Sequence, residues 1–214
     1  MTRSRTLLLL TLSASALAAI LWMLSPPHPE QSLLGFHSSA FALQMVRDWP
    51  TLTIVLATPA RAGFRVHTLV DFAFILAYGA LWALMARRYG ERAWLNWIVG
   101  ACVVAGALCD VMENAAILRV LGMERGFSDE MALAIRTWAL RKWMLLMLAW
   151  FGLSLALGTH RLWPLAVGYA FAAGVTAAAF FTSVSMLELT LPVLGLTLLV
   201  QAGYFIRHSG TARA

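Results

Sequence analysis

The residues best suited to chemistry form one stripe within the apolar stretch 94–120. Asp110, Glu113 and Asn114 stand at positions i, i+3 and i+4, and a helix places such residues on one face. Two carboxyl groups one turn apart can share a proton, so that one acts as an acid and the other as a base. We therefore interpret Asp110 and Glu113 as candidate catalytic residues and Asn114 as a candidate ligand-binding residue.

Two further apolar stretches carry polar groups with helical spacing. Asp71 and Tyr78 share a face in one of them, and Lys142 shares a face with Trp138 in the other, where Arg141 lies beside them. A charge at the bilayer centre costs about 2.5–3.5 kcal/mol on insertion scales, so such groups are expected to be paired and to face the protein interior. All five residues are further candidates for ligand binding.

The composition indicates the environment of these groups. Of the 214 residues, 61% are hydrophobic and 12% are charged, whereas a soluble domain is about half apolar and about a quarter charged. So few polar side chains cannot cover a water-facing surface, and membrane lipids are therefore the expected partners. A net charge of +6 would indicate nucleic acid in a soluble protein. Here the basic residues flank apolar stretches, as topology signals do, and no nucleic-acid partner is expected.

The apolar pattern predicts an all-α fold, a polytopic integral membrane helical bundle that forms a single transmembrane domain over residues 1–214. A spanning helix needs about 20 mostly apolar residues. The six stretches that qualify are 6–24, 67–86, 94–120, 131–157, 163–182 and 189–206. Cleavage of the first as a signal peptide would leave five spans. Its apolar run is longer than a signal peptide needs, which favours an uncleaved anchor.

Residues 25–66 form the one long segment between spans. Its apolar side chains recur at roughly helical spacing, at Phe36, Phe41, Met45, Val46 and Trp49. This spacing predicts one extracytoplasmic amphipathic helix along the membrane surface, and Pro50 is expected to end it.

The short basic loops predict the direction of the spans. The loops after the second, fourth and sixth spans carry basic residues close to helix ends, and the positive-inside rule places them in the cytoplasm. Both termini are then cytoplasmic, in a membrane that we interpret as a bacterial inner membrane. In this direction the polar groups of the second, third and fourth spans all fall in the outer half of the bilayer. They are expected to form one cluster open to the extracytoplasmic side, with Glu188 at the outer end of the last span.

Other chemistry finds little support in the sequence. A metal site is not expected, because no histidine lies on the polar stripes of the third and fourth spans and Lys142 would compete for the carboxylates. His67 is interpreted as an interfacial residue, and Trp143 and Trp150 as packing residues. Cys102 and Cys109, seven residues or about 10 Å apart on one helix, are too far apart for a disulfide. No motif identifies a cofactor, which stays unknown.

Three functions remain open from the sequence. In the first, the cluster binds a lipid-like ligand and acts on it by acid–base chemistry through Asp110 and Glu113. In the second, the same carboxylates serve a small proton- or cation-coupled transporter. In the third, the protein has a structural or assembly role, and the buried charges only hold helices together, as buried ion pairs often do. Whether the protein is an enzyme is left open.

Overall fold

Most of the residues that the structure describes are helical, and none of them lies in a strand. The computed structural model describes residues 3–25, 36–56, 60–124 and 126–209. The elements are α1 (Arg3–Leu24), α2 (Ser39–Gln44), α3 (Trp49–Val55), α4 (Ala60–Tyr89), α5 (Ala93–Leu121), α6 (Asp129–Thr159), α7 (Trp163–Phe181), the 3-10 helix η2 (Val184–Leu189) and α8 (Thr190–Ser209). Six of these helices, α1 and α4 to α8, are long and apolar enough to cross a membrane. The prediction of an all-α bundle with six helices that could span a membrane is confirmed.

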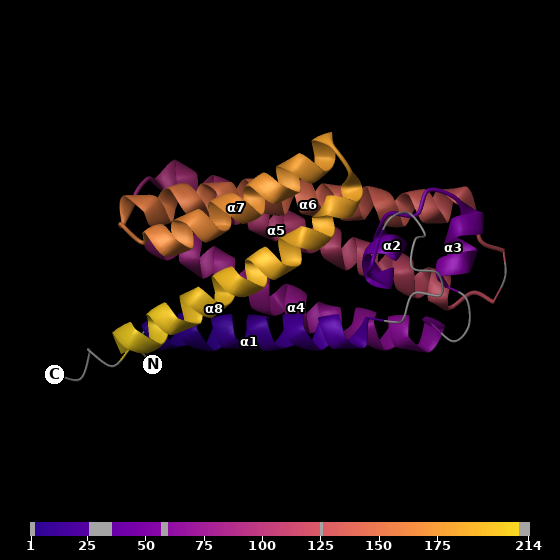
Figure 1. Cartoon of the computed structure of the whole chain (residues 1–214), viewed down its shortest axis with the longest axis horizontal. Coiled ribbons are helices and arrows are strands. Elements are labelled where there is room, and N and C mark those ends of the chain that lie inside the picture. The colour runs from indigo at the N-terminus through magenta and orange to yellow at the C-terminus, as the bar shows by residue number, and fades with distance from the viewer. Residues whose placement is uncertain (1–2, 26–35, 57–59, 125, 210–214) are drawn as a thin grey trace.

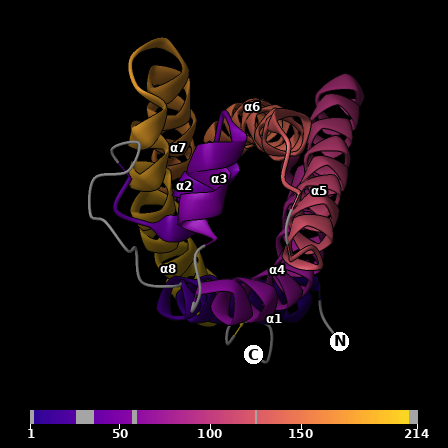
Figure 2. The same cartoon turned by 90° about the vertical axis from the view of Figure 1, so that its right-hand side faces the viewer.

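The six long helices pack in a ring. Each contacts the next in the order α1, α4, α5, α6, α7 and α8, and α8 contacts α1 again. Figure 2 looks into this ring from the end where α2 and α3 lie. Short connections make consecutive spans antiparallel neighbours, which accounts for most of this order. The contact between α1 and α8 is different, because it joins the two spans that are farthest apart in the chain.

The start of α1 and the end of α8 lie at the same end of the ring, which we term the terminus end (Figure 1). The last turn of α4 contains Arg87 and Arg88, and the last turn of α8 contains Arg207. Because α4 and α8 both run toward the terminus end, the basic residues of their last turns lie there. We term the opposite end, where α2 and α3 lie, the cap end.

Arginines of α4 fix the cap end of α5. The last carbonyl groups of a helix have no partner within the helix. Arg61 donates hydrogen bonds to the carbonyl oxygens of Val120, Leu121 and Met123, and Arg65 donates to Leu121 over 3.1 Å. These bonds hold the two helices in register beside the polar residues that they carry.

The helices α2 and α3 lie at the cap end, beside α6 and η2 (Figure 2). They stand where the sequence predicts one amphipathic helix along the membrane surface. Phe36, Phe41, Met45 and Val46 are at most 4% exposed, so this segment turns its apolar side chains into the protein. Pro50 lies in the first turn of α3, where a missing amide N–H costs no hydrogen bond, and so it helps to begin a helix instead of ending one.

Hydrogen bonds begin α3 and tie the segment between α2 and α3 to α6. Asp48 precedes α3 and accepts the Thr51 amide hydrogen over 2.8 Å, as an N-cap residue does. Hydrogen bonds from Thr51 lower the pKa of Asp48 below its ordinary value of 3.8. Arg136 of α6 donates to the carbonyl oxygen of Met45 over 3.0 Å and so ties the segment between α2 and α3 to the ring.

Candidate ligand-binding site

Lys142 of α6 stands between two carboxylates of α5. Its Nζ lies 2.9 Å from Asp110 Oδ1 and 2.6 Å from Glu113 Oε2, and all three side chains are at most 5% exposed. A lone charge is costly in apolar surroundings, and short contacts between opposite charges offset that cost. The spacing of three residues on α5 brings both acids within reach of one ammonium group.

Two more hydrogen bonds attach α4 to this arrangement. Tyr78 Oη donates to Asp110 Oδ2 over 2.9 Å, and Asn114 Nδ2 donates to Asp71 Oδ2 over 2.9 Å. Asp110 thus uses one oxygen for Lys142 and the other for Tyr78. Three consecutive spans contribute to what we term the polar cluster: Asp71, Tyr78, Asp110, Glu113, Asn114 and Lys142.

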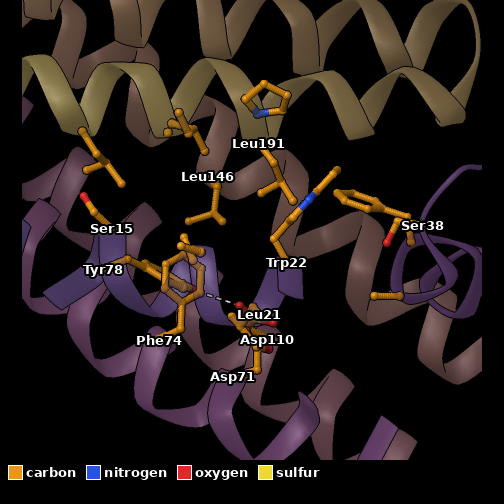
Figure 3. Close-up of a pocket in the computed structure, with 18 of the residues that line it drawn as sticks. Ser15, Leu21, Trp22, Ser38, Asp71, Phe74, Tyr78, Asp110, Leu146 and Leu191 are labelled. Atoms are coloured by element: carbon orange, nitrogen blue, oxygen red, sulfur yellow. Dashed lines mark hydrogen bonds between the residues drawn. The ribbon is translucent and has the colours of Figure 1, made fainter. Parts of the chain in front are cut away.

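The polar cluster borders a cavity of about 510 Å³ inside the ring. Side chains of α1, α4, α6 and α8 form most of its wall, α5 contributes Asp110, and α2 contributes at the cap end. Figure 3 shows Asp71, Asp110 and Tyr78 on one side of the cavity and Leu191 of α8 on another. Small-molecule sites have volumes of about 300–1,000 Å³, so this cavity has the size of a ligand site.

The wall of the cavity is charged on one side only. Asp71, Asp110 and Lys142 are the charged residues in the described lining, and they come from α4, α5 and α6. The lining residues of α1 and α8 include no charged side chain, and those of α8 are all leucine, proline or glycine. The cavity is therefore amphipathic, with a polar wall facing an apolar one.

The cavity reaches the outside of the ring between α1 and α8. Trp22 and Leu199 both line it, yet they are 59% and 64% exposed. The two helices meet where Gln201 Nε2 donates to Thr11 Oγ1 over 2.7 Å. From there α8 slants away from α1 toward the cap end (Figure 1). Trp22 lies on this diverging side, about 16 Å along α1 from Thr11, so the opening lies between the two helices.

A buried hydrogen-bond network lies at the terminus side of the cavity. Trp82, which lines the cavity, donates through Nε1 to Tyr169 Oη over 3.1 Å. Tyr169 donates to Gln201 Oε1 over 2.8 Å, and Gln201 in turn donates to Thr11. The network joins α4, α7, α8 and α1, and each of its four side chains is at most 2% exposed. It holds these four helices together at the terminus side of the cavity.

One buried donor in the cavity wall has no acceptor. Trp150 lines the cavity and is 0% exposed, and its Nε1 has no hydrogen-bond partner among the described residues. Unpaired buried donors are uncommon in folded proteins, and each costs about 1–3 kcal/mol. The structure thus leaves this buried indole N–H without the hydrogen bond that such donors usually make.

The structure brings six of the eight predicted site residues together and leaves two apart. Arg141 is exposed, and its guanidinium carbon lies 5.0 Å from the ring centre of Trp138 on the same helix. Neither residue lines the cavity. Glu188, expected near the cluster, instead accepts the backbone amide hydrogens of His37 and Ser38 over 3.1 and 2.6 Å. It holds the segment that leads into α2.

The two candidate catalytic residues differ in their access to the cavity. Asp110 lines it, whereas Glu113 is 1% exposed and borders a much smaller pocket of about 20 Å³. Lys142 lies between the two carboxyl groups. A ligand in the larger cavity therefore meets Asp110 and Lys142 directly, and Glu113 acts on it only through Lys142.

Sequence reasoning missed several residues of the cavity wall. His67, Phe41, Trp143 and Trp150 all line it. His67 precedes Asp71 by one helical turn, and this spacing is the signal that could have placed it at the site instead of at the interface. Trp143 and Trp150 were interpreted as packing residues, and the spacing of seven that puts them on one face of α6 would have served as a signal. Phe41 had none, because nothing in the sequence shows that α2 folds back over the ring.

Neither a metal-binding group among the described residues nor a similarity to known proteins identifies the chemistry of the site. Among the described residues, no three His, Cys, Asp or Glu side chains are grouped so as to hold a metal ion. Cys102 and Cys109 are both free thiols. Comparison with protein-family models, with curated proteins and with solved structures finds no match to this chain.

Proposed function

We propose that this protein binds one lipid-like, amphipathic molecule within the membrane. Its polar end lies at the polar cluster, and its alkyl part lies against the walls formed by α1 and α8. The observation that carries this proposal is the division of the cavity into one charged and one apolar wall. An amphipathic ligand satisfies both, because its alkyl part stays in apolar surroundings while its polar end keeps hydrogen-bond partners.

The opening between α1 and α8 supports the same proposal. Both helices are long and apolar enough to cross a membrane, so a mouth between them faces lipid. Trp22 and Leu199 flank this mouth with large apolar surfaces. A lipid-like molecule can move sideways from the bilayer into the cavity with its alkyl chain in apolar surroundings throughout.

Binding is better supported than acid–base catalysis. Both oxygens of Asp110 already accept a hydrogen bond, from Lys142 and from Tyr78. Glu113 lies behind Lys142 and does not line the cavity. We therefore assign Asp71 to contact with the polar end of the ligand, with the ion pair of Lys142 and Asp110 beside it, and Glu113 to the positioning of Lys142.

Filling the cavity tests this function. Gly195 of α8 lines the cavity, and a Cβ atom added there meets no atom within 4 Å. Gly195→Phe should therefore occupy the cavity without displacing the helix. Protein purified in a mild non-ionic detergent would be extracted with organic solvent and the extract analysed by mass spectrometry. We expect about one amphiphilic molecule per wild-type chain and a loss of at least about tenfold in the variant.

Gly203→Phe is the matched control. Gly203 lies on the same helix, does not line the cavity, and likewise has no atom within 4 Å of an added Cβ. This variant should retain the molecule as wild type does. Equal retention by wild type and Gly195→Phe, or no retained molecule in wild type, would sink the proposal and favour a purely structural polar cluster.

We further propose that the protein lies in a bacterial inner membrane with both termini in the cytoplasm. The basic last turns of α4 and α8 at the terminus end support this direction, since basic residues favour the cytoplasmic side. The cap end then faces away from the cytoplasm. In this orientation the mouth between α1 and α8 opens toward the outer leaflet.

A further inference from the structure

The polar cluster contains more acidic than basic groups. It holds three carboxyl groups and one lysine, and Lys142 pairs with Asp110 and Glu113. Asp71 has no ion-pair partner among the described residues, and its hydrogen bond comes from the neutral amide of Asn114. Asp71 also lines the cavity. A carboxyl group without an ion-pair partner therefore borders the space in which the ligand would lie.

The rest of the wall near Asp71 is rich in aromatic rings. Seven of the residues that line the cavity are aromatic. The rings of Phe74 and Tyr78 lie 5.2 Å apart on the side of Asp71, and those of Phe41 and Trp143 lie 5.6 Å apart toward the cap end. Aromatic faces carry negative potential and attract cations, above all ammonium groups whose water has been removed.

We propose that the polar end of the ligand is an organic ammonium group, paired with Asp71 and enclosed by the aromatic rings of the cavity. This inference rests on the proposed function and names the class of ligand that the site takes. The ammonium group supplies the positive charge that Asp71 lacks. An alkyl chain attached to it follows the apolar wall of α1 and α8.

The charges in the wall disfavour the other classes of head group. An anionic head group would approach both Asp71 and Asp110, while Lys142 is already shared between two carboxylates. An uncharged head group would leave Asp71 without a counter-charge, so that its carboxyl group would have to take up a proton. Selectivity for a cation thus follows from repulsion of anions as well as from attraction.

Three probes with one alkyl chain test the inference: decylammonium, decanol and decyl sulfate. Each is titrated into delipidated full-length protein in non-ionic detergent, and binding is counted by native mass spectrometry. Binding to Gly195→Phe is subtracted to remove adsorption outside the cavity. We expect decylammonium to bind wild type at least about 30-fold more tightly than decanol does, the ratio expected for a charge pair buried from water, and decyl sulfate to bind most weakly.

Asp71→Asn should abolish the preference for decylammonium while decanol still binds. Glu130→Gln removes an exposed acid at the cap end and is the matched control, in which the preference should persist. If Asp71→Asn does not fold, the order of the three probes on wild type still decides. Absence of any binding above that of Gly195→Phe would overturn the proposed function. Equal binding of all three probes, or a preference that survives in Asp71→Asn, would overturn only the ammonium inference.

Two sources of an ammonium head group can be separated in the same assay. A lysolipid with an ethanolamine head group is compared with one that has a glycerol head group and the same chain. Preference for the ethanolamine lysolipid would identify a membrane lipid as the source, and preference for decylammonium over both would identify a free lipophilic amine. Either result supports the inference, and a preference for the glycerol lysolipid over both amines would contradict it.

Discussion

Arg141 and Lys142 are neighbours in the chain with opposite surroundings. Lys142 is buried against two carboxylates, whereas Arg141 is exposed beside Trp138. Adjacent residues on a helix point about 100° apart, so only one of the two can face the ring interior. The buried lysine is the single residue that contacts both acids of α5, and its charge is what makes their burial tolerable.

Replacing the lysine should therefore unfold the protein more easily. Lys142→Met leaves Asp110 and Glu113 as neighbouring buried acids without a counter-charge, which costs about 3–5 kcal/mol in proteins where one partner of a buried pair is removed. We expect a clear fall in the thermal unfolding temperature in detergent. Arg141→Met is the matched control and should change stability by less than about 0.5 kcal/mol, as exposed substitutions do. Similar unfolding temperatures for the two variants would contradict this account.

The sequence predicted most of the polar cluster because two signals agreed. Helical spacing placed Asp110, Glu113 and Asn114 on one face, and the direction of the spans placed Asp71 and Lys142 at a similar depth. It could not separate Lys142 from Arg141, because both are basic and both lie next to the predicted face. That choice depends on the rotation of α6 in the ring, which contacts between helices decide.

At the scale of the elements, α7 and α8 approach closely at Gly168. A Cβ atom added to Gly168 would lie 2.6 Å from Thr197 Oγ1 and 2.8 Å from its Cγ2. Small residues allow two membrane helices to pack this closely. This contact positions α8, and α8 forms the apolar wall of the cavity.

A larger residue at this contact should separate the two helices. We expect Gly168→Val to lower the free energy of unfolding by about 1–3 kcal/mol, the usual cost of overpacking, as measured by thermal or denaturant unfolding. Gly174→Val lies on the same helix and shares the same change in helix propensity, but its added Cβ meets no atom within 4 Å. A loss in Gly174→Val as large as in Gly168→Val would show that close packing at Gly168 is not the cause.

The six spans were easier to predict than the helices α2 and α3 at the cap end. Long apolar stretches bounded by polar residues leave little choice but spanning helices. Between the first two spans, helical spacing of apolar residues fits a helix on a membrane surface and a helix packed on protein equally well. The structure selects the second, because Phe41 stacks on Trp143 with ring centres 5.6 Å apart and Glu188 binds the chain just before α2. Such long-range contacts have no local sequence signal.

At the scale of the whole molecule, the two ends of the ring differ in their charged residues. Helices α4 and α8 end in basic turns at the terminus end, whereas Arg119 at the cap end of α5 is accompanied by the acidic residues Asp129 and Glu130 of α6. The sequence could not predict that α1 and α8 close the ring. In a membrane, faces toward lipid and faces toward protein are both apolar, so their pattern does not reveal which helices are neighbours.

Cysteine labelling tests the proposed direction of the ring. Cys102 and Cys109 would first be replaced by alanine, and single cysteines then introduced as Thr53→Cys at the cap end or Glu91→Cys at the terminus end, both exposed positions. We expect a membrane-impermeant maleimide added to intact cells to label Thr53→Cys alone, and Glu91→Cys to react only after the cells are opened. The reverse pattern would invert the orientation.

Closure of the ring by α1 and α8 has a consequence for biosynthesis. The helix α8 leaves the ribosome after the other five spans, so the cavity lacks its apolar wall until then. The polar cluster comes from the three consecutive spans α4, α5 and α6, and its charges can pair as soon as α6 has been inserted. The charged groups of the polar cluster, which are costly to bury in a membrane, can thus pair before the cavity is enclosed. The site becomes enclosed only when the hydrogen bond between Gln201 and Thr11 joins the latest span to the earliest.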